Sequence, residues 1–211
     1  MHYQIFPVTH FQQNCSLLWC EATRQAALID PGGEAERLIE GITRQQVTLT
    51  QILLTHGHVD HVGAAAQLAA YYRVPMIGPH VAEAELLDAL PLQCQLLGVT
   101  PPVTSFRPTR WLAEGESIIL GEQQLSVLHC PGHTPGHLVF FCAAAHLAWV
   151  GDVLFRGSVG RTDLPGGDAA TLQFSIQQKL WLLGDEVTFI PGHGPLSTIG
   201  HERRYNHWVP S

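Results

Sequence analysis

Charged side chains are scarce in this sequence of 211 residues, and positively charged ones are scarcest. Charged residues make up 14% of the chain, only 11 of them are Lys or Arg, and the formal net charge is −7. Proteins that bind nucleic acid neutralise phosphates with Lys and Arg. The few cations here form no run, so we expect no nucleic-acid partner.

The sequence also lacks long apolar runs and paired cysteines. No run reaches the roughly 18 residues that span a bilayer, and residues 1–7 have neither the basic start nor the apolar stretch of a signal peptide. The five cysteines are an odd set without a short paired spacing, which predicts reduced, buried thiols. We therefore expect a cytoplasmic protein that has no membrane partner.

The apolar content, 45% of residues, is enough to fill one core, and strands alternate with helices along the chain. The predicted strands are residues 3–8, 14–20, 25–29, 47–54, 117–120, 124–128, 138–142, 145–150 and 187–190. The predicted helices are 34–40, 62–72, a stretch within 80–97, 169–183 and a short one at 201–208. A connector with Pro101, Pro102 and Pro108 separates two halves, about 1–100 and 110–211. We predict a single α/β domain over 1–211, in which two sheets face each other and helices cover the outer faces.

Histidine is abundant, with 13 residues, and three of these lie within residues 55–61, Thr-His-Gly-His-Val-Asp-His. This segment follows a predicted apolar strand and precedes a predicted helix. A sharp turn there can direct His56 and His58 to one point, and Asp60 and His61 to another. Imidazole nitrogens and carboxylate oxygens are suitable ligands for Zn²⁺, and also for Fe or Mn.

Three further candidate ligands follow predicted strands in the second half. His133 lies in Cys-Pro-Gly-His-Thr-Pro-Gly-His, Asp152 in Val-Gly-Asp, and His193 in Ile-Pro-Gly-His-Gly. Each sits in a turn that contains glycine or proline, so each side chain can reach the same edge of a sheet. Four such segments in one chain predict a metal centre.

These motifs resemble those of the metallo-β-lactamase superfamily. Residues 56–61 match its HxHxDH signature, and His133, Asp152 and His193 match its remaining ligand positions in order. The turn at residues 30–33, Asp-Pro-Gly-Gly, is also similar to the family's. The resemblance therefore covers nearly the whole chain and implies the four-layer αβ/βα sandwich of that family.

The resemblance further implies two divalent metal ions, zinc first and iron or manganese as alternatives. One metal would take His56, His58 and His133. The other would take Asp60, His61 and His193, and Asp152 would bridge the two. Such a pair supplies hydroxide from a bridging water at neutral pH and polarises a carbonyl under attack. Asp60 and Asp152 are the candidate catalytic carboxylates.

Other conspicuous residues have supporting roles in this interpretation. His137, four residues after His133, is expected to make a supporting or structural hydrogen bond beside the site. Asp30 is expected to hold a metal-bound histidine in place by a hydrogen bond, with turn capping as the alternative. The remaining histidines lack a position after a strand and are expected on the surface or in packing. They are His2, His10, His80, His129, His146, His201 and His207.

Within the superfamily the chain most resembles the glyoxalase II group, and in particular its short bacterial members. This implies hydrolysis of S-2-hydroxyacylglutathione, such as S-D-lactoylglutathione, and a role in methylglyoxal detoxification. Arg161, in Gly-Arg-Thr-Asp, is the candidate for binding a substrate carboxylate, and a salt bridge to Asp163 is the alternative. Only 18 residues follow His193, so we expect no helical domain there to hold glutathione.

Two rival activities remain within the same superfamily. A persulfide dioxygenase shares the Gly-Arg-Thr-Asp stretch and would hold a single iron at His56, His133 and Asp152. Against it, Pro-Gly-His-Gly-Pro at residues 191–195 is similar to the hydrolase form of the last motif. A nuclease would need an RNA-recognition domain and a basic face, and the sequence indicates neither.

Overall fold

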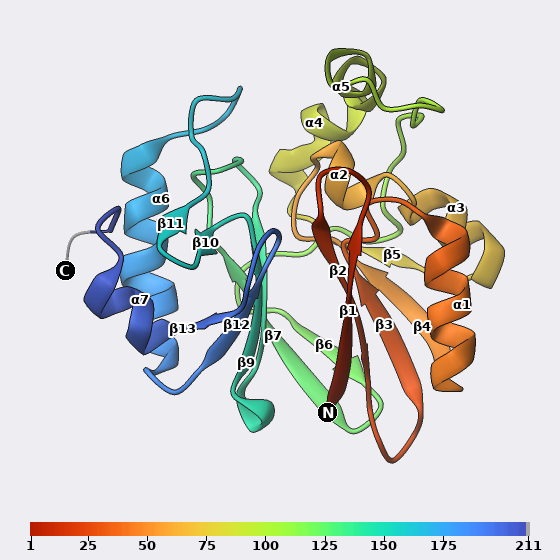
Figure 1. Cartoon of the computed structure of the whole chain (residues 1–211), viewed down its shortest axis with the longest axis horizontal. Coiled ribbons are helices and arrows are strands. Elements are labelled where there is room, and N and C mark those ends of the chain that lie inside the picture. Colours follow the sequence, from red (N-terminus) through yellow and green to blue (C-terminus); the bar gives the residue numbers. More distant parts are fainter. Residues whose placement is uncertain (210–211) are drawn as a thin grey trace.

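Two β-sheets face each other in the computed structural model, which describes residues 1–209, and helices cover both outer faces (Figure 1). The first sheet has the strand order β1-β2-β3-β4-β5. Its strands are β1 (His2–Val8), β2 (Gln13–Trp19), β3 (Gln25–Ile29), β4 (Thr48–Leu53) and β5 (Met76–Ile77). Strands β1 to β3 pair antiparallel, whereas β3, β4 and β5 run parallel.

The second sheet has the order β13-β12-β9-β8-β7-β6. Its strands are β6 (Ser117–Leu120), β7 (Gln123–His129), β8 (Leu138–Cys142), β9 (Leu147–Gly151), β12 (Thr188–Pro191) and β13 (Ser197–Thr198). Because β7, β8 and β9 alternate in direction and β12 is parallel to β9, the carboxyl ends of β7, β9 and β12 meet at one edge. A hairpin of β10 (Leu154–Phe155) and β11 (Ser158–Val159) lies beyond that edge.

Three apolar layers hold the sheets and helices together. Between the sheets, residues such as Leu18 and Leu53 of the first pack with Phe140 and Trp149 of the second. The outer face of the first sheet packs against α1 (Ala35–Gln45) and α3 (Ala65–Tyr72). The outer face of the second packs against α6 (Ala169–Ser175) and α7 (Ile199–Tyr205). The predicted four-layer sandwich is confirmed.

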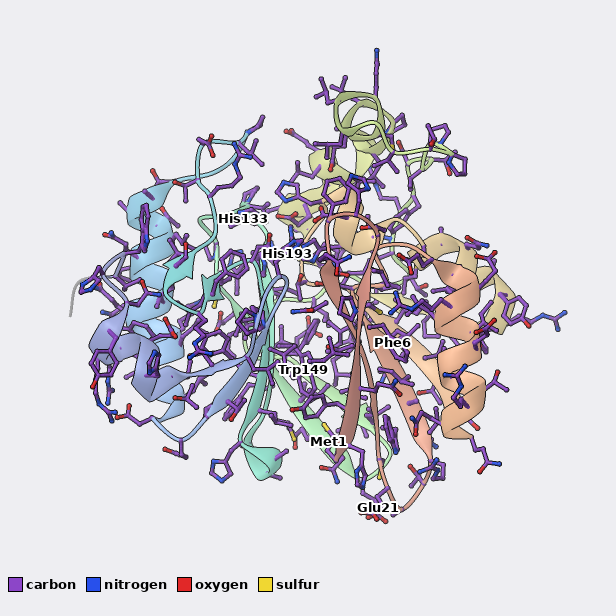
Figure 2. All side chains as sticks on the ribbon, viewed as in Figure 1. Met1, Phe6, Glu21, His133, Trp149 and His193 are labelled. Carbon is purple, nitrogen blue, oxygen red and sulfur yellow. The ribbon has the colours of Figure 1, made fainter. Side chains whose placement is uncertain are left out.

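Two aromatic residues illustrate that opposite faces of the sheets pack into different apolar layers. Trp149 lies between the sheets, whereas Phe6 points to the outer layer of the first sheet (Figure 2). The Phe6 ring packs directly against Gly41 of α1, where an added Cβ would lie 2.5 Å from the ring. A glycine is required there because helix and sheet approach each other so closely.

The predicted helix over 62–72 is wrong at its start. A separate short helix, α2 (Val59–Val62), carries Asp60 and His61, and the chain breaks at Gly63 before α3. The cause is a contact with the turn after β3. The Ala64 N–H donates to the Pro31 carbonyl, and an added Cβ on Gly63 would lie 2.4 Å from the Gly32 oxygen. Local periodicity carries no sign of that contact.

Other differences are matters of extent. The first helix continues to Gln45, five residues beyond its predicted end, and the short last helix is Ile199–Tyr205 rather than 201–208. The stretch within 80–97 consists of a 3₁₀ turn (Val81–Glu83), α4 (Ala84–Asp88) and α5 (Leu90–Leu97), with Pro91 in the first turn of α5. From 169 to 183 the chain is helical throughout, with a π-helical segment at Ile176–Leu180. The sequence analysis missed the two-residue strands, which are too short to show periodicity.

Within residues 1–209, no helix combines the length and the apolar character needed to cross a bilayer.

Candidate metal centre

All seven predicted ligands lie at the edge where strands from both sheets end. His56, His58, Asp60 and His61 follow β4 in the first sheet. His133 follows β7, Asp152 follows β9, and His193 follows β12 in the second sheet. In Figure 2, His133 and His193 stand together at this edge between the sheets. The fold therefore brings together residues as far as 137 positions apart in the chain.

The first group contains three imidazole nitrogens that point at one another. His58 Nδ1 lies 3.1 Å from His56 Nε2 and 3.0 Å from His133 Nε2. His56 is fully buried and His133 is 2% exposed. Three ring nitrogens at this separation are the arrangement of a three-histidine metal site.

The second group contains Asp60, His61 and His193. Asp60 Oδ2 lies 3.1 Å from His193 Nε2 and 3.7 Å from His61 Nε2. Asp60 and His61 occupy the first turn of α2, and His193 reaches them from the opposite sheet. Two imidazoles and one carboxylate can likewise hold a divalent cation.

Asp152 lies between the two groups. Its Oδ1 is 3.3 Å from His61 Nε2, and its Oδ2 is 3.6 Å from His133 Nε2 and 3.7 Å from His193 Nε2. Gly192 leaves the room for this carboxylate, since a Cβ there would lie 2.0 Å from Asp152 Oδ1. One carboxylate therefore faces both groups, as a ligand shared by two cations would.

The outward nitrogen of four imidazoles is held by a hydrogen-bond acceptor. His56 Nδ1 lies 3.0 Å from Thr55 Oγ1, and His61 Nδ1 lies 2.9 Å from Asp30 Oδ2. His133 Nδ1 lies 2.7 Å from the Arg161 carbonyl oxygen, and His193 Nδ1 lies 3.1 Å from that of Phe11. Each acceptor fixes the ring proton on Nδ1, which leaves the Nε2 lone pair free to face the cluster.

Asp30 connects several of these contacts. Its Oδ1 accepts the Thr55 N–H at 2.8 Å, and its Oδ2 accepts the Thr55 hydroxyl at 2.6 Å as well as His61 Nδ1. Asp30, His56 and His61 also lie close enough to form a third potential metal group. Their facing atoms already satisfy one another through Thr55 and these hydrogen bonds, so no cation is needed on that side.

Unpaired buried atoms test whether cations fit the cluster. His61 Nε2 and Asp152 Oδ1 are both buried, and neither has a hydrogen-bond partner within residues 1–209. Buried polar atoms without a partner are costly. Both atoms face the space between the two groups, so a cation bound there would satisfy them. The donor set therefore fits two divalent metal ions.

The cluster also has a favourable charge state. Burial opposes ionisation of Asp152, but the neighbouring imidazoles, His61 first, outweigh it and hold the pKa of this carboxyl well below its usual range. Burial and the His133 imidazole lower the pKa of His58 to about 4, and burial holds that of His56 well below its ordinary value. The first group therefore offers neutral imidazoles at pH 7, the form that binds metal.

His137 lies behind the first group rather than in it. Its ring stacks on His56 at 4.6 Å between centroids, and its Nε2 accepts the Asp152 N–H at 3.0 Å. It therefore touches a residue of the first group and the carboxylate between the groups. The seven other histidines fall outside both groups.

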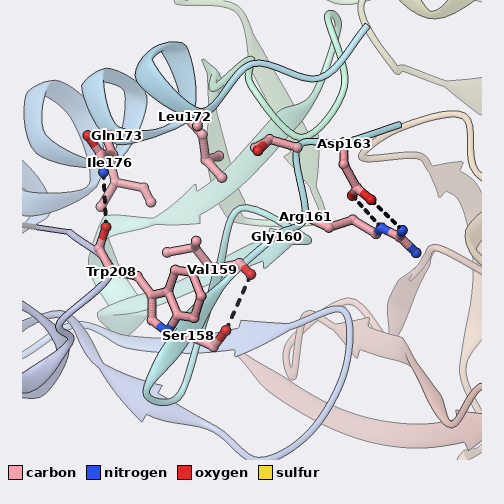
Figure 3. A pocket seen from close by; sticks show the side chains of 11 residues that line it. Ser158, Val159, Gly160, Arg161, Asp163, Leu172, Gln173, Ile176 and Trp208 are labelled. Carbon is pink, nitrogen blue, oxygen red and sulfur yellow. Dashed lines mark hydrogen bonds and ion pairs between the residues drawn. The ribbon is translucent and has the colours of Figure 1, made fainter. Parts of the chain in front are cut away.

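Arg161 contributes to the site in a way that the sequence analysis did not anticipate. Its guanidinium is exposed and makes two hydrogen bonds to Asp163, at 2.8 and 2.7 Å (Figure 3). Its carbonyl oxygen, by contrast, holds His133. The predicted contact of its side chain with a substrate carboxylate stays a prediction, because the Asp163 pair occupies the guanidinium.

Glu83 is a residue that the sequence analysis missed. This fully buried carboxylate accepts the Gly57 N–H at 2.7 Å and the Gly136 N–H at 2.5 Å. It thus joins the turn that carries His56 and His58 to the turn that carries His133 and His137. The sequence offers no local signal for this role, since nothing near Glu83 distinguishes it from the exposed Glu85 two residues later.

An open cleft of about 890 Å³ leads to the cluster. Its lining includes His58, Asp60, His133, Asp152 and His193. The α4–α5 pair and the segment 155–166 lie on either side of it (Figure 1). A smaller pocket of about 350 Å³ borders the same segment, and Trp208 stands at its far side from Arg161 (Figure 3).

Comparison with known proteins agrees with this geometry. The profile of the metallo-β-lactamase superfamily matches residues 8–193. The chain is 48% identical to hydroxyacylglutathione hydrolase GloC of Haemophilus influenzae over 100% of this chain and 99% of that protein. It is 35% identical to the probable metallo-hydrolase YqgX of Bacillus subtilis, over 98% and 96% of the two chains.

Two solved structures are similar throughout. One is the BLEG-1 B3 metallo-β-lactamase, with a TM-score of 0.91, 36% identity and full coverage of both chains. The other is TTHA1623 in a di-iron-bound form, with a TM-score of 0.88, 36% identity and coverage of 98% and 100%.

Proposed function

The chain belongs to the metallo-β-lactamase superfamily, and on that basis we propose that this metallohydrolase cleaves the thioester of S-2-hydroxyacylglutathione. The observation that carries the proposal is the pair of ligand groups with Asp152 between them. The whole-length similarity to the GloC hydrolase supports the thioester substrate.

We propose His56, His58 and His133 as ligands of one cation, Asp60, His61 and His193 as ligands of the other, and Asp152 as their bridge. When bound, two such cations supply a hydroxide nucleophile at neutral pH and polarise the carbonyl under attack. Zinc is our first choice of metal, and the same donors accept iron or manganese. The di-iron form of TTHA1623 makes iron a specific alternative.

The residues of this chain position the reaction. Water adds to the thioester carbonyl carbon, the carbon–sulfur bond breaks, and the thiolate leaves. A thiolate is a weak base, so it leaves with little need for a general acid. Asp60 faces the cleft and can orient the attacking water, while Asp30 and the Phe11 and Arg161 carbonyls hold the imidazoles in place.

The second group favours hydrolysis over the single-iron dioxygenase. A single-iron enzyme has no use for Asp60, His61 and His193 as ligands. Here these residues converge, and the buried His61 Nε2 has no other partner within the described part of the chain. We also propose a cytoplasmic location, because all five cysteines are free and buried.

The test is hydrolysis of S-D-lactoylglutathione by protein of known metal content, with oxygen uptake on glutathione persulfide measured alongside. We expect thioester turnover with two metals per chain and no oxygen uptake. Oxygen uptake with one iron per chain would make the protein a dioxygenase instead. A chromogenic cephalosporin belongs in the same assay, because one structure of 36% identity is a B3 metallo-β-lactamase.

A further inference from the structure

Helix α5 exposes leucine side chains on the face that borders the cleft. Leu92, Leu96 and Leu97 are 55%, 75% and 48% exposed, although the helix has only eight residues. The opposite face, with Leu90 and Cys94, is buried in the core. Gln95 is the exposed polar side chain of α5. Leucines that are this exposed, grouped beside a cleft, indicate a ligand that covers them.

The exposed leucines border the cleft that leads to the metal cluster. Leu92, Leu96 and Leu97 line the same cleft as five of the seven candidate ligands, among them His58 and Asp60. Leu86 and Ala89 extend the apolar surface toward the cluster. A molecule whose reacting carbonyl lies at the cluster can therefore reach these leucines without leaving the cleft.

The two walls of the cleft differ in charge. The wall formed by α4 and α5 carries Glu85 and no cation. The other wall carries Arg161, which is the one Lys or Arg among the residues that line the cleft in the described part of the chain. The Arg161–Asp163 pair is exposed and therefore weak, so a substrate carboxylate can compete for the guanidinium.

We propose that the enzyme prefers thioesters with an extended apolar acyl group, which packs on the leucine wall, while the anionic thiol portion lies toward Arg161. The proposal rests on the thioester hydrolase function proposed above. The thiol portion of a glutathione thioester carries its carboxylates, so Glu85 disfavours it on the leucine wall. The acyl group is the portion left to cover Leu92, Leu96 and Leu97.

The experiment compares 2-hydroxyacyl thioesters of glutathione with straight acyl chains from three to eight carbons. We expect kcat/KM to rise about two- to fourfold for each added methylene that the wall buries. Leu96→Gln and Leu92→Gln should flatten this increase and change turnover of the three-carbon substrate little. Leu182→Gln is the matched control, because Leu182 is 78% exposed and lies outside the cleft.

A second series tests the orientation. Thioesters of N-acetylcysteamine carry no carboxylate on the thiol side. Arg161→Met should lower kcat/KM for the glutathione thioesters by a larger factor than kcat/KM for the N-acetylcysteamine thioesters. If Leu92→Gln and Leu96→Gln instead lower kcat/KM for thioesters with an apolar group on the thiol side, the proposed orientation is overturned.

The remaining outcomes are distinct. Turnover of S-D-lactoylglutathione without any chain-length dependence would overturn the apolar preference and leave the hydrolase function standing. Absence of turnover on every thioester would overturn both. Sedimentation velocity tests whether a second copy of the chain covers the leucine face instead. If Leu96→Gln dissociates a dimer while the variant keeps the chain-length dependence, the leucine face is a subunit interface and the proposal is overturned.

Discussion

At the scale of single residues, Asp152 is the residue that the two ligand groups share, because its carboxylate faces imidazoles of both. We expect Asp152→Ala to lose bound metal and turnover together, since the two groups lose their shared anion. Metal analysis of the purified variant, with its activity on S-D-lactoylglutathione, makes the measurement. Wild-type turnover by this variant would show that Asp152 is no bridge.

Asp30 acts on the cluster through His61. Asp30→Asn keeps the size of the side chain but replaces one acceptor oxygen with a donor, so it cannot accept the Thr55 N–H and the His61 Nδ1 proton together, as the two carboxylate oxygens do. Loss of such a supporting contact typically weakens metal binding about 10- to 100-fold. Titration with a competing chelator should show this loss, and excess metal should restore activity.

The control for Asp30→Asn is Asp88→Asn. Asp88 is exposed, pairs with Arg107 and does not line the cleft. Its variant should bind metal like the wild type. Equal metal affinity in both variants would contradict a role for Asp30 in holding His61.

The seven candidate ligands could be picked out from the sequence because their residue types and spacing indicate metal chemistry. Residues 56–61 place four donors in one short segment, and His133, Asp152 and His193 each follow a strand. The hydrogen-bond acceptors that hold the imidazoles in place could be predicted only in part. Asp30 has a side chain that signals its role, whereas Phe11 and Arg161 act through backbone carbonyls that every residue possesses.

At the scale of elements, Glu83 joins two ligand-bearing turns to the segment that begins α4. Glu83→Ala would leave the Gly57 and Gly136 N–H groups buried and without a partner. Each such group costs about 1–3 kcal/mol, so we expect the free energy of unfolding to fall by about 2–5 kcal/mol. Urea denaturation measures this, and metal affinity should fall as well because both turns loosen.

Glu85→Ala is the matched control for this variant. Glu85 is the same residue type, two positions later and exposed, so its replacement should change stability by no more than about 0.5 kcal/mol. Similar losses in the two variants would show that Glu83 does not join the turns. Glu83→Gln keeps one acceptor oxygen, so its free energy of unfolding should lie between those of the wild type and Glu83→Ala.

The predicted boundaries of helices and strands agree with the structure where local periodicity determines them. They differ where a tertiary contact determines them. The strand at 25–29 was predicted to the residue, and β4 within one residue at each end. The break between α2 and α3 depends on the turn at Pro31 and Gly32, which lies far away in the sequence. The two-residue strands depend on pairing partners rather than on their own residues.

At the scale of the whole molecule, the candidate metal centre draws its residues from both sheets. His56, His58, Asp60 and His61 come from the first sheet, and His133, Asp152 and His193 come from the second. A ligand that binds only the folded state stabilises it, by about 2.7 kcal/mol for one site at a free concentration 100 times its Kd. Bound metal should therefore contribute to holding the sheets together.

Removal of the metals should lower the melting temperature. For a domain of this size, each 1 kcal/mol shifts Tm by about 2–4 °C, so chelation should lower it by about 5–10 °C for each site emptied. Differential scanning calorimetry before and after dialysis against a chelator measures the shift, and added Zn²⁺ should reverse it. The Asp152→Ala variant is the control: without bound metal it should melt at the same temperature with and without chelator. An unchanged Tm in the metal-loaded wild type would contradict a metal centre that links the two sheets.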